Sequence, residues 1–359
     1  MVRHCLAVLL ASVAMLASPL LCCAPAEAGD KAPATIKVII AGTLLGSTRV
    51  VGDIASISGG YKDVETEFGT KVELTAVASG PTATAALVSG SADFGIFSTV
   101  EVMRAAVIGQ PILGLMGMST GGDVLFVTSK KNADVGDGLA ALKKFDGKRW
   151  GVVSVGGIGA AFGGLAADSA GIDWKSQTVI PGGSDSALVG SLLNDRLDMI
   201  ILNIPTAATL FSKGEGHVVF DTNSPEAVAK WGEVIGGTFA ANADFAKKYP
   251  EATAAMVRAE LKALLKAKEL KDDAKAVYAM YPEDYRQALG FDAFSIGWML
   301  YVPTFENLSG IITDKDIAST TAVLRKIGRL KDDEQVPAST FNSDYVREAY
   351  KSLGVPVPQ

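Results

Sequence analysis

The stretch at residues 72–99, VELTAVASGPTATAALVSGSADFGIFST, decides the fold class. Residues 72–77 alternate polar and apolar side chains and predict a strand. Residues 82–89 favour a helix that Gly90 ends, and residues 92–97 predict the next strand. Because strands and helices alternate, the stretch predicts α/β layers around a mostly parallel sheet.

The same order continues on both sides. Upstream, residues 36–40 predict a strand and 48–57 a helix; downstream, residues 112–116 predict another strand. The pattern restarts after Lys130, with strands at 150–155, 177–180 and 197–202, a last strand at 218–220, and helices at 160–170, 187–193 and from 203–205 onward. From residue 250 only helices are predicted, at 250–270, 275–289, 314–327 and 343–353. We therefore expect two α/β units and a helical C-terminal region.

Residues 1–28 have the features of a secretory signal peptide. Arg3 and His4 precede an uncharged apolar run at 5–21, and Ala26-Glu27-Ala28 matches a cleavage site. An uncleaved anchor, or a lipid on Cys22 or Cys23, remains an alternative. No later apolar run reaches the roughly 18–20 residues that span a bilayer, so we expect an exported protein that is soluble once cleaved.

Composition excludes several classes of function. The chain has 359 residues, of which 48% are apolar, and a net charge of −6, which does not suit a nucleic-acid binder. All three cysteines lie in the first 23 residues, and His217 is the only histidine after the leader. Cysteine nucleophiles, disulfide frameworks and zinc sites built from Cys and His are therefore excluded from the mature chain.

An ordered set of motifs resembles the solute-binding proteins of bacterial ABC importers, in the nitrate/sulfonate/taurine and thiamine-precursor group. The resemblance covers residues 35–350, and its motifs are VASGPT at 77–82, ALVSGSADFG at 86–95, IGQPI at 108–112, KKFDGKRWGV at 143–152, LNDRLDM at 193–199, AKKYPEA at 246–252 and IITD at 311–314. It implies a periplasmic-binding-protein type II fold, with two α/β lobes joined by two crossing segments. Lobe one would hold 33–127 and 236–359, and lobe two 128–235, with crossings near 124–127 and 234–237.

In open α/β sheets the ligand site lies beyond the carboxyl ends of the strands. Here those ends carry small polar loops that run into helix N-termini, whose unpaired N–H groups favour an anion. The expected ligand-binding residues are Leu44, Leu45, Gly46, Ser47, Gly80, Pro81, Thr82, Ser98, Thr99, Gly156, Gly157, Ile158, Gly159, Gly183, Ser184, Asp185 and Asn203. Plain helix capping explains the Ser, Thr and Asp residues of this set equally well.

The loop at 157–163, GIGAAFG, follows a predicted strand and opens a helix, as a dinucleotide fingerprint does. An NAD(P)-binding oxidoreductase is therefore a second hypothesis. Against it, residues 177–180, where a ribose-binding acid is expected, contain no Asp or Glu. A hydrolase is less favoured still, because there is no G-x-S-x-G motif and His217 lies in a predicted exposed turn.

The resemblance implies a periplasmic protein, not an enzyme, that captures a small solute and delivers it to an ABC permease and its ATPase. We expect a monomer, with no metal, cofactor or nucleic acid. Leu44, Leu45, Ile158 and Ile204 would give the cleft apolar walls, which favours an organic anion of the sulfonate or aromatic carboxylate type. A neutral or cationic heterocycle such as a pyrimidine is the rival, with Glu101 or Asp185 as its partner. A protein that feeds a sensor or another transporter class also remains open.

Overall fold

The strands around the quoted stretch form one sheet. The computed structural model describes residues 31–41, 50–77, 80–155 and 157–358. Within these residues the first sheet has five strands in the order β2-β1-β3-β10-β4, namely β1 (Thr35–Ala41), β2 (Lys71–Val77), β3 (Phe94–Ser98), β4 (Ile112–Thr120) and β10 (Ile235–Asn242). Strands β1, β2 and β3 are parallel, and β10 runs antiparallel between β3 and β4.

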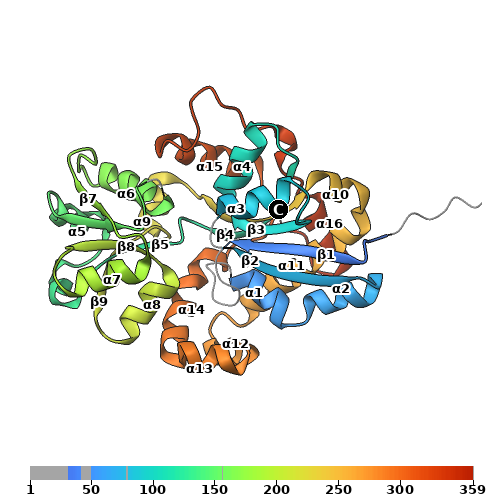
Figure 1. Cartoon of the computed structure of the whole chain (residues 1–359), viewed down its shortest axis with the longest axis horizontal. Coiled ribbons are helices and arrows are strands. Elements are labelled where there is room, and N and C mark those ends of the chain that lie inside the picture. The colour runs from blue at the N-terminus through green and yellow to red at the C-terminus, as the bar shows by residue number, and fades with distance from the viewer. Residues whose placement is uncertain (1–30, 42–49, 78–79, 156, 359) are drawn as a thin grey trace, which may run out of the picture. The chain divides into compact units, whose positions relative to one another are not determined.

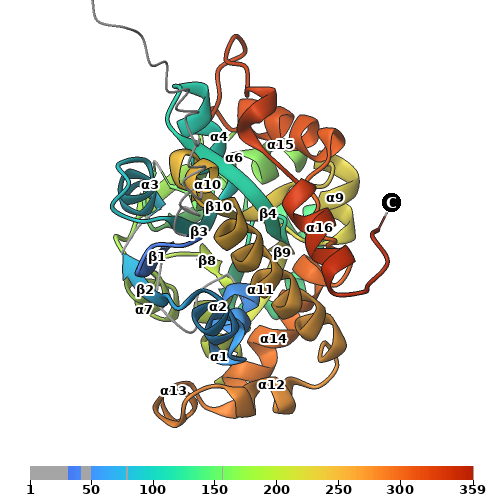
Figure 2. The same ribbon diagram turned by 90° about the vertical axis from the view of Figure 1, so that its right-hand side faces the viewer.

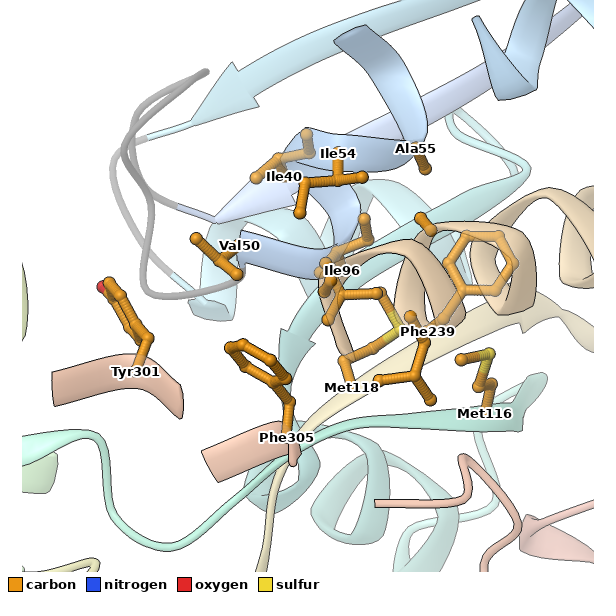
Figure 3. Packing of buried hydrophobic residues seen from close by; sticks show 14 of the residues in the cluster. Ile40, Val50, Ile54, Ala55, Ile96, Met116, Met118, Phe239, Tyr301 and Phe305 are labelled. Atoms are coloured by element: carbon orange, nitrogen blue, oxygen red, sulfur yellow. The ribbon is translucent and has the colours of Figure 1, made fainter. Parts of the chain in front are cut away.

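Alternation along β1 places apolar side chains on both faces of this sheet. Val38 and Ile40 join the cluster formed with α1 (Val50–Ile57), α2 (Gly60–Phe68) and α11 (Pro250–Glu269), whereas Ile39 joins α3 (Gly80–Val88) and α4 (Thr99–Val107). In Figure 3, Ile40 and Ile54 lie on one side of Ile96, and Met116, Met118 and Phe239 lie nearby. Both faces of the first sheet are therefore covered, as a parallel sheet requires.

The second sheet of the described residues also has five strands, in the order β7-β6-β8-β5-β9. They are β5 (Val124–Ser129), β6 (Arg149–Val152), β7 (Thr178–Pro181), β8 (Met199–Asn203) and β9 (Gly216–Asp221). One face carries an aromatic cluster, in which the ring of Phe126 packs edge-on against Trp150 and Phe220 at 6.0 and 5.6 Å. The helices of this unit are α5 (Gly138–Leu142), α6 (Ile158–Ser169), α7 (Asp185–Leu193), α8 (Ile204–Ser212) and α9 (Pro225–Trp231).

The chain passes from one sheet to the other at residues 121–123 and 232–234 (Figure 1). Strand β5 runs antiparallel to β8, so it begins at the edge where β6, β7 and β8 end. Strand β10 likewise begins at the edge where β3 ends. The carboxyl-end edges of both sheets therefore meet at the crossings, which is where a ligand site is expected.

Three expectations about this region are wrong. Residues 124–127 are not a crossing but part of β5, which pairs with β8 from Val124 onward, and of the expected crossing at 234–237 all but Val234 belong to β10. Residues 218–220 are not the last strand, because β10 follows and inserts between β3 and β4. His217 is also not in an exposed turn: it lies in β9, and its Nε2 is 2.8 Å from the carbonyl oxygen of Gly136.

The C-terminal region is helical, as predicted, but divided differently. It contains α10 (Ala243–Lys248), α11, α12 (Ala274–Met280), α13 (Glu283–Leu289), α14 (Phe291–Phe305), α15 (Asp314–Lys326) and α16 (Asp344–Ser352). The single helix expected at 275–289 is two helices, because Pro282 cannot donate an N–H to a helix interior. The unpredicted helix α14 packs on α8 (Figure 1), and Lys31–Gln359 form one compact unit.

The expected signal peptide lies outside the described residues. In the part of the chain that the structure does describe, no helix combines the length and apolar character that crossing a membrane requires. The same residues contain no group of three or more His, Cys, Asp or Glu side chains arranged to hold a metal ion.

Candidate functional site

An inner cavity of about 130 Å³ lies where the crossings meet the carboxyl ends of the strands. Ser98 ends β3 on one side, Asn203 ends β8 on the other, and Phe162 of α6 adds an aromatic ring. The remaining lining residues are Val100, Gly121, Gly122, Asp123, Val124, Ile158, Val234, Ile235, Gly236, Thr320 and Leu324. Residues of both sheets therefore line the inner cavity.

An outer cavity of about 920 Å³ adjoins the inner one and shares Val100 and Ile158 with it. Its walls are α3, α4, the loop before α6, and the segment that follows α15; in Figures 1 and 2, α4 lies between α3 and α15. The lining residues that bear on the argument are Gly80, Pro81, Glu101, Arg104, Ser154, Gly157, Arg329, Leu330, Lys331 and Glu334. A volume of this size accommodates a drug-sized organic molecule.

Ser98 and Asn203 occupy equivalent positions at the two strand ends. The Ser98 hydroxyl accepts from the backbone N–H of Val100 at 3.3 Å, and the Asn203 side-chain oxygen accepts from that of Thr206 at 3.1 Å. Each residue therefore caps the helix that follows its strand while lining the inner cavity. Ser98 and Asn203 therefore combine the two roles considered for them: each caps a helix, and each lines the cavity.

The wall from the second sheet satisfies its own polar groups. The amide nitrogen of Asn203 donates to Asp185, and the hydroxyl of Thr206 donates to the same carboxylate oxygen, Oδ2, at 3.3 Å. Burial raises the pKa of Asp185, and these two hydrogen bonds oppose that rise. Asp185 therefore acts as an internal acceptor that orients Asn203.

The other expected residues lie in several places. Thr99 is fully buried and its hydroxyl is 2.7 Å from that of Thr238, so it faces β10 and lines neither cavity. Ser184 accepts from the N–H of Ala187 at 3.2 Å and caps α7. Thr82, Gly159, Gly183, Ser184 and Asp185 line neither cavity, whereas Gly80, Pro81, Gly157 and Ile158 line the outer one. Leu44, Leu45, Gly46, Ser47 and Gly156 lie outside the described residues.

The segment at 328–334 reaches the outer cavity from the end of α15. Gly328 adopts φ +69°, a left-handed conformation that turns the chain at the end of the helix. The next residue, Arg329, donates from Nη2 to the carbonyl oxygen of Gly157 at 2.8 Å. Glu334 holds the segment together, since its Oε2 accepts from the N–H of Lys331 at 2.9 Å.

Sequence reasoning did not assign this segment to the site, and it placed the crossings a few residues too far along the chain. The pairs Gly121-Gly122 and Gly236-Gly237 were a usable signal, because close backbone approach requires glycine. A Cβ on Gly236 would lie 2.5 Å from the carbonyl oxygen of Gly121, so the two crossings touch there. Residues 328–334 carry no such local signal, because tertiary packing alone brings them to the cavity.

The glycines of 157–163 have a packing role. A Cβ on Gly163 would lie 2.7 Å from the ring of Trp174 and 2.9 Å from Ile201. Gly163 therefore allows close approach of α6 to the sheet, a role that this glycine has with or without a bound dinucleotide.

Comparison with known proteins agrees with this geometry. A model of the NMT1-like family matches residues 44–280, well over half of the chain, so the chain belongs to the NMT1-like family. No curated protein matches it.

Solved structures show the same fold. A protein from Bordetella bronchiseptica shares 21% identity at TM-score 0.66, covering 90% of this chain and 98% of its own. The periplasmic nitrate-binding protein of Synechocystis shares 17% at 0.66, covering 91% of each chain. The alkanesulfonate-binding protein of Xanthomonas axonopodis, bound to MOPS, shares 16% at 0.63, covering 87% of this chain and 99% of its own.

These likenesses establish the periplasmic-binding-protein fold for this chain, as predicted. The structural neighbours include periplasmic sulfonate-binding and nitrate-binding proteins and a ligand-binding component of an ABC-type import system.

Proposed function

We propose that this chain is the exported solute-binding component of an ABC importer. It captures a small organic anion of the sulfonate or aromatic carboxylate type between its two sheets and delivers it to a permease and its ATPase. The observation that carries the proposal is the pair of adjoining cavities at the facing carboxyl ends of the two sheets. Binding would close the two units around the cargo, a hinge motion at the crossings.

The charges around the outer cavity support an anion. Arg104, Arg329 and Lys331 line it, against the carboxylates of Glu101 and Glu334. The N-terminus of α6, whose N-cap Gly157 has no side chain to satisfy it, adds the positive end of a helix. Val100, Ile158 and Leu330 supply apolar surface for the body of the cargo.

The lobe division, export and oligomeric state belong to the same proposal. The sequence predicts a first lobe of 33–127 and 236–359. Because β5 pairs with β8, we place the boundary of its first part at residues 121–123, and the second lobe lies between the two crossings. The leader 1–28 is cleaved on export to the periplasm. The protein works as a monomer, without cofactor or metal.

An oxidoreductase that uses the 157–163 loop is the competing class, and the absence of Asp and Glu from residues 177–180, where a ribose-binding acid is expected, argues against it. A heterocycle binder is the competing cargo, and one observation favours it: the carboxylate oxygen Oε2 of Glu101 is buried with no hydrogen-bond partner in the described part of the chain.

Thermal shift of the purified protein tests the proposal. The panel is benzenesulfonate, benzoate, nitrate, a pyrimidine and NADP. A bound ligand at about 100 times its Kd adds roughly 2.7 kcal/mol of stability, so a rise in Tm with an organic anion, unchanged by NADP, is expected. A rise with NADP alone would refute the transport function, and a rise with the pyrimidine alone would refute the anionic cargo.

A further inference from the structure

Glu101 in the outer cavity has a buried carboxylate oxygen without a hydrogen-bond partner among the described residues. Glu101 lies in the first turn of α4, two residues after Thr99 begins the helix at the end of β3. Its Oε2 is shielded from solvent and accepts no hydrogen bond from the described residues. A buried acceptor left unmade costs free energy, so such a group calls for a donor.

The place of this carboxylate is set by the backbone opposite. Gly80 opens α3, and a Cβ built there would lie 2.5 Å from Oε1 of Glu101. Glycine at position 80 therefore makes room for the carboxylate between α3 and α4. The side chain lines the cavity from that slot, on the wall across from Gly157 and Arg329.

Two other carboxylates near the cavities show what a satisfied one looks like. Asp185 accepts from Asn203 and Thr206, and Glu334 accepts from the backbone of Lys331 and lies 3.9 Å from its ammonium group. Both carboxylates accept hydrogen bonds from the protein itself. Glu101 differs because Arg104, one turn further along α4, lines the same cavity without an ion pair to it within 4.0 Å in the described structure.

We propose that Glu101 is a cargo-binding residue that accepts an N–H from the bound solute, so that the cargo carries an amino group or ring N–H beside its apolar body. This inference rests on the proposed solute-binding function and sharpens its substrate class. The donor completes the hydrogen bonding of Oε2, and a cargo with a methyl group in place of the amino group leaves the carboxylate unsatisfied. Discrimination between two such analogues is large when a site is built around a hydrogen bond.

Two matched pairs of probes test it by calorimetry on the purified full protein. The first pair is 4-aminobenzenesulfonate and 4-methylbenzenesulfonate, and the second is 4-amino-2-methylpyrimidine and 2,4-dimethylpyrimidine. Within each pair only the donor changes. We expect the wild type to bind the amino member of at least one pair about 10-fold or more tightly, the ratio that one hydrogen bond to a charged group produces.

The variants are Glu101→Met, which keeps the length of the side chain and removes the acceptor, and Asp134→Asn, which removes one negative charge at an exposed position outside both cavities, as the control. The amino preference should fall to about 1-fold in Glu101→Met and persist in Asp134→Asn. Loss of the preference in both variants would assign it to the net charge of the protein and overturn the role of Glu101.

The outcomes separate this inference from the proposed function. If the wild type binds both sulfonates equally, the inference fails and the capture of an organic anion stands. If it binds only the aminopyrimidine, the inference stands and the anionic cargo fails. If no probe of either pair binds, both fail.

Discussion

The two sides of the cavities differ in whether their buried polar side chains have hydrogen-bond partners. On the side of the second sheet, Asn203 lines the inner cavity, and Asp185 behind it accepts hydrogen bonds from Asn203 and Thr206, so these three side chains satisfy one another. On the wall from the first sheet, Glu101 keeps a buried oxygen without a partner in the described structure. We therefore expect the side of the second sheet to determine the shape of the site. The unpaired acceptor of Glu101 should determine which cargo is selected.

The largest effect should come from the crossing that sets the distance between the walls. Gly121 has φ +82°, and a Cβ there would overlap the side-chain oxygen of Asn223. Gly121→Ala should cost roughly 2–5 kcal/mol, from 1–2 for left-handed backbone and 1–3 for overpacking. Urea denaturation measures it. Gly69→Ala, at φ +62° in open space, is the control and should cost only the backbone part; equal losses would contradict the close packing of Gly121 against Asn223.

The helix layer of the first sheet should give stability an unusual pH dependence. Glu260 is fully buried, accepts from Tyr61, and burial raises its pKa to about 8. The native state keeps a proton that the unfolded chain releases above its ordinary pKa of about 4.5. The contribution of this protonated carboxyl group to the free energy of unfolding is therefore complete below about pH 4.5. It is lost as the pH rises to about 8.

Glu260→Gln stays neutral and removes that loss. The stability of the variant relative to the wild type should increase by roughly 3 kcal/mol between pH 5 and pH 7, at 1.36 kcal/mol per pH unit. Denaturation midpoints across this range measure the difference. Parallel curves for the two proteins would mean that Glu260 is ionised in the native state.

The self-satisfied wall should lose moderate stability when its acceptor is removed. Asp185→Ala leaves the Asn203 amide and the Thr206 hydroxyl without their common acceptor and should cost about 1–3 kcal/mol. Asp134→Ala, at an exposed position, should stay within about 0.5 kcal/mol. If the two variants melt alike, the contrast between the walls does not hold.

The smallest effect should come from the other wall. Glu101→Met replaces a buried acceptor without a partner by an apolar side chain, a change that is near neutral or slightly stabilising. Without added ligand, its Tm should equal or slightly exceed that of the wild type. A clear drop in Tm would show that Glu101 supports the fold rather than the cargo.

Local pattern predicted the elements whose stability is local. Strand β2 and helix α11 lie where the alternation and the helical pattern placed them. Strand β10 was missed because its small residues, with Gly236 and Gly237, form a strand only between two others. Helix α14 was missed because Gly297 and Pro303 lower its helix propensity, and packing on α8 compensates.

The sequence by itself determined the α/β order, the strand ends that carry Ser98 and Asn203, and the glycines that allow close approach. These follow from side-chain period and capping, which act over a few residues. Only the tertiary structure decided which polar groups are satisfied: Arg329 meets Gly157 across 172 positions, and Asp185 meets Asn203 across 18. A carboxylate is available to a ligand only if no protein group donates a hydrogen bond to it. Segments that are distant in the sequence supply those donors, so the local sequence pattern does not predict them.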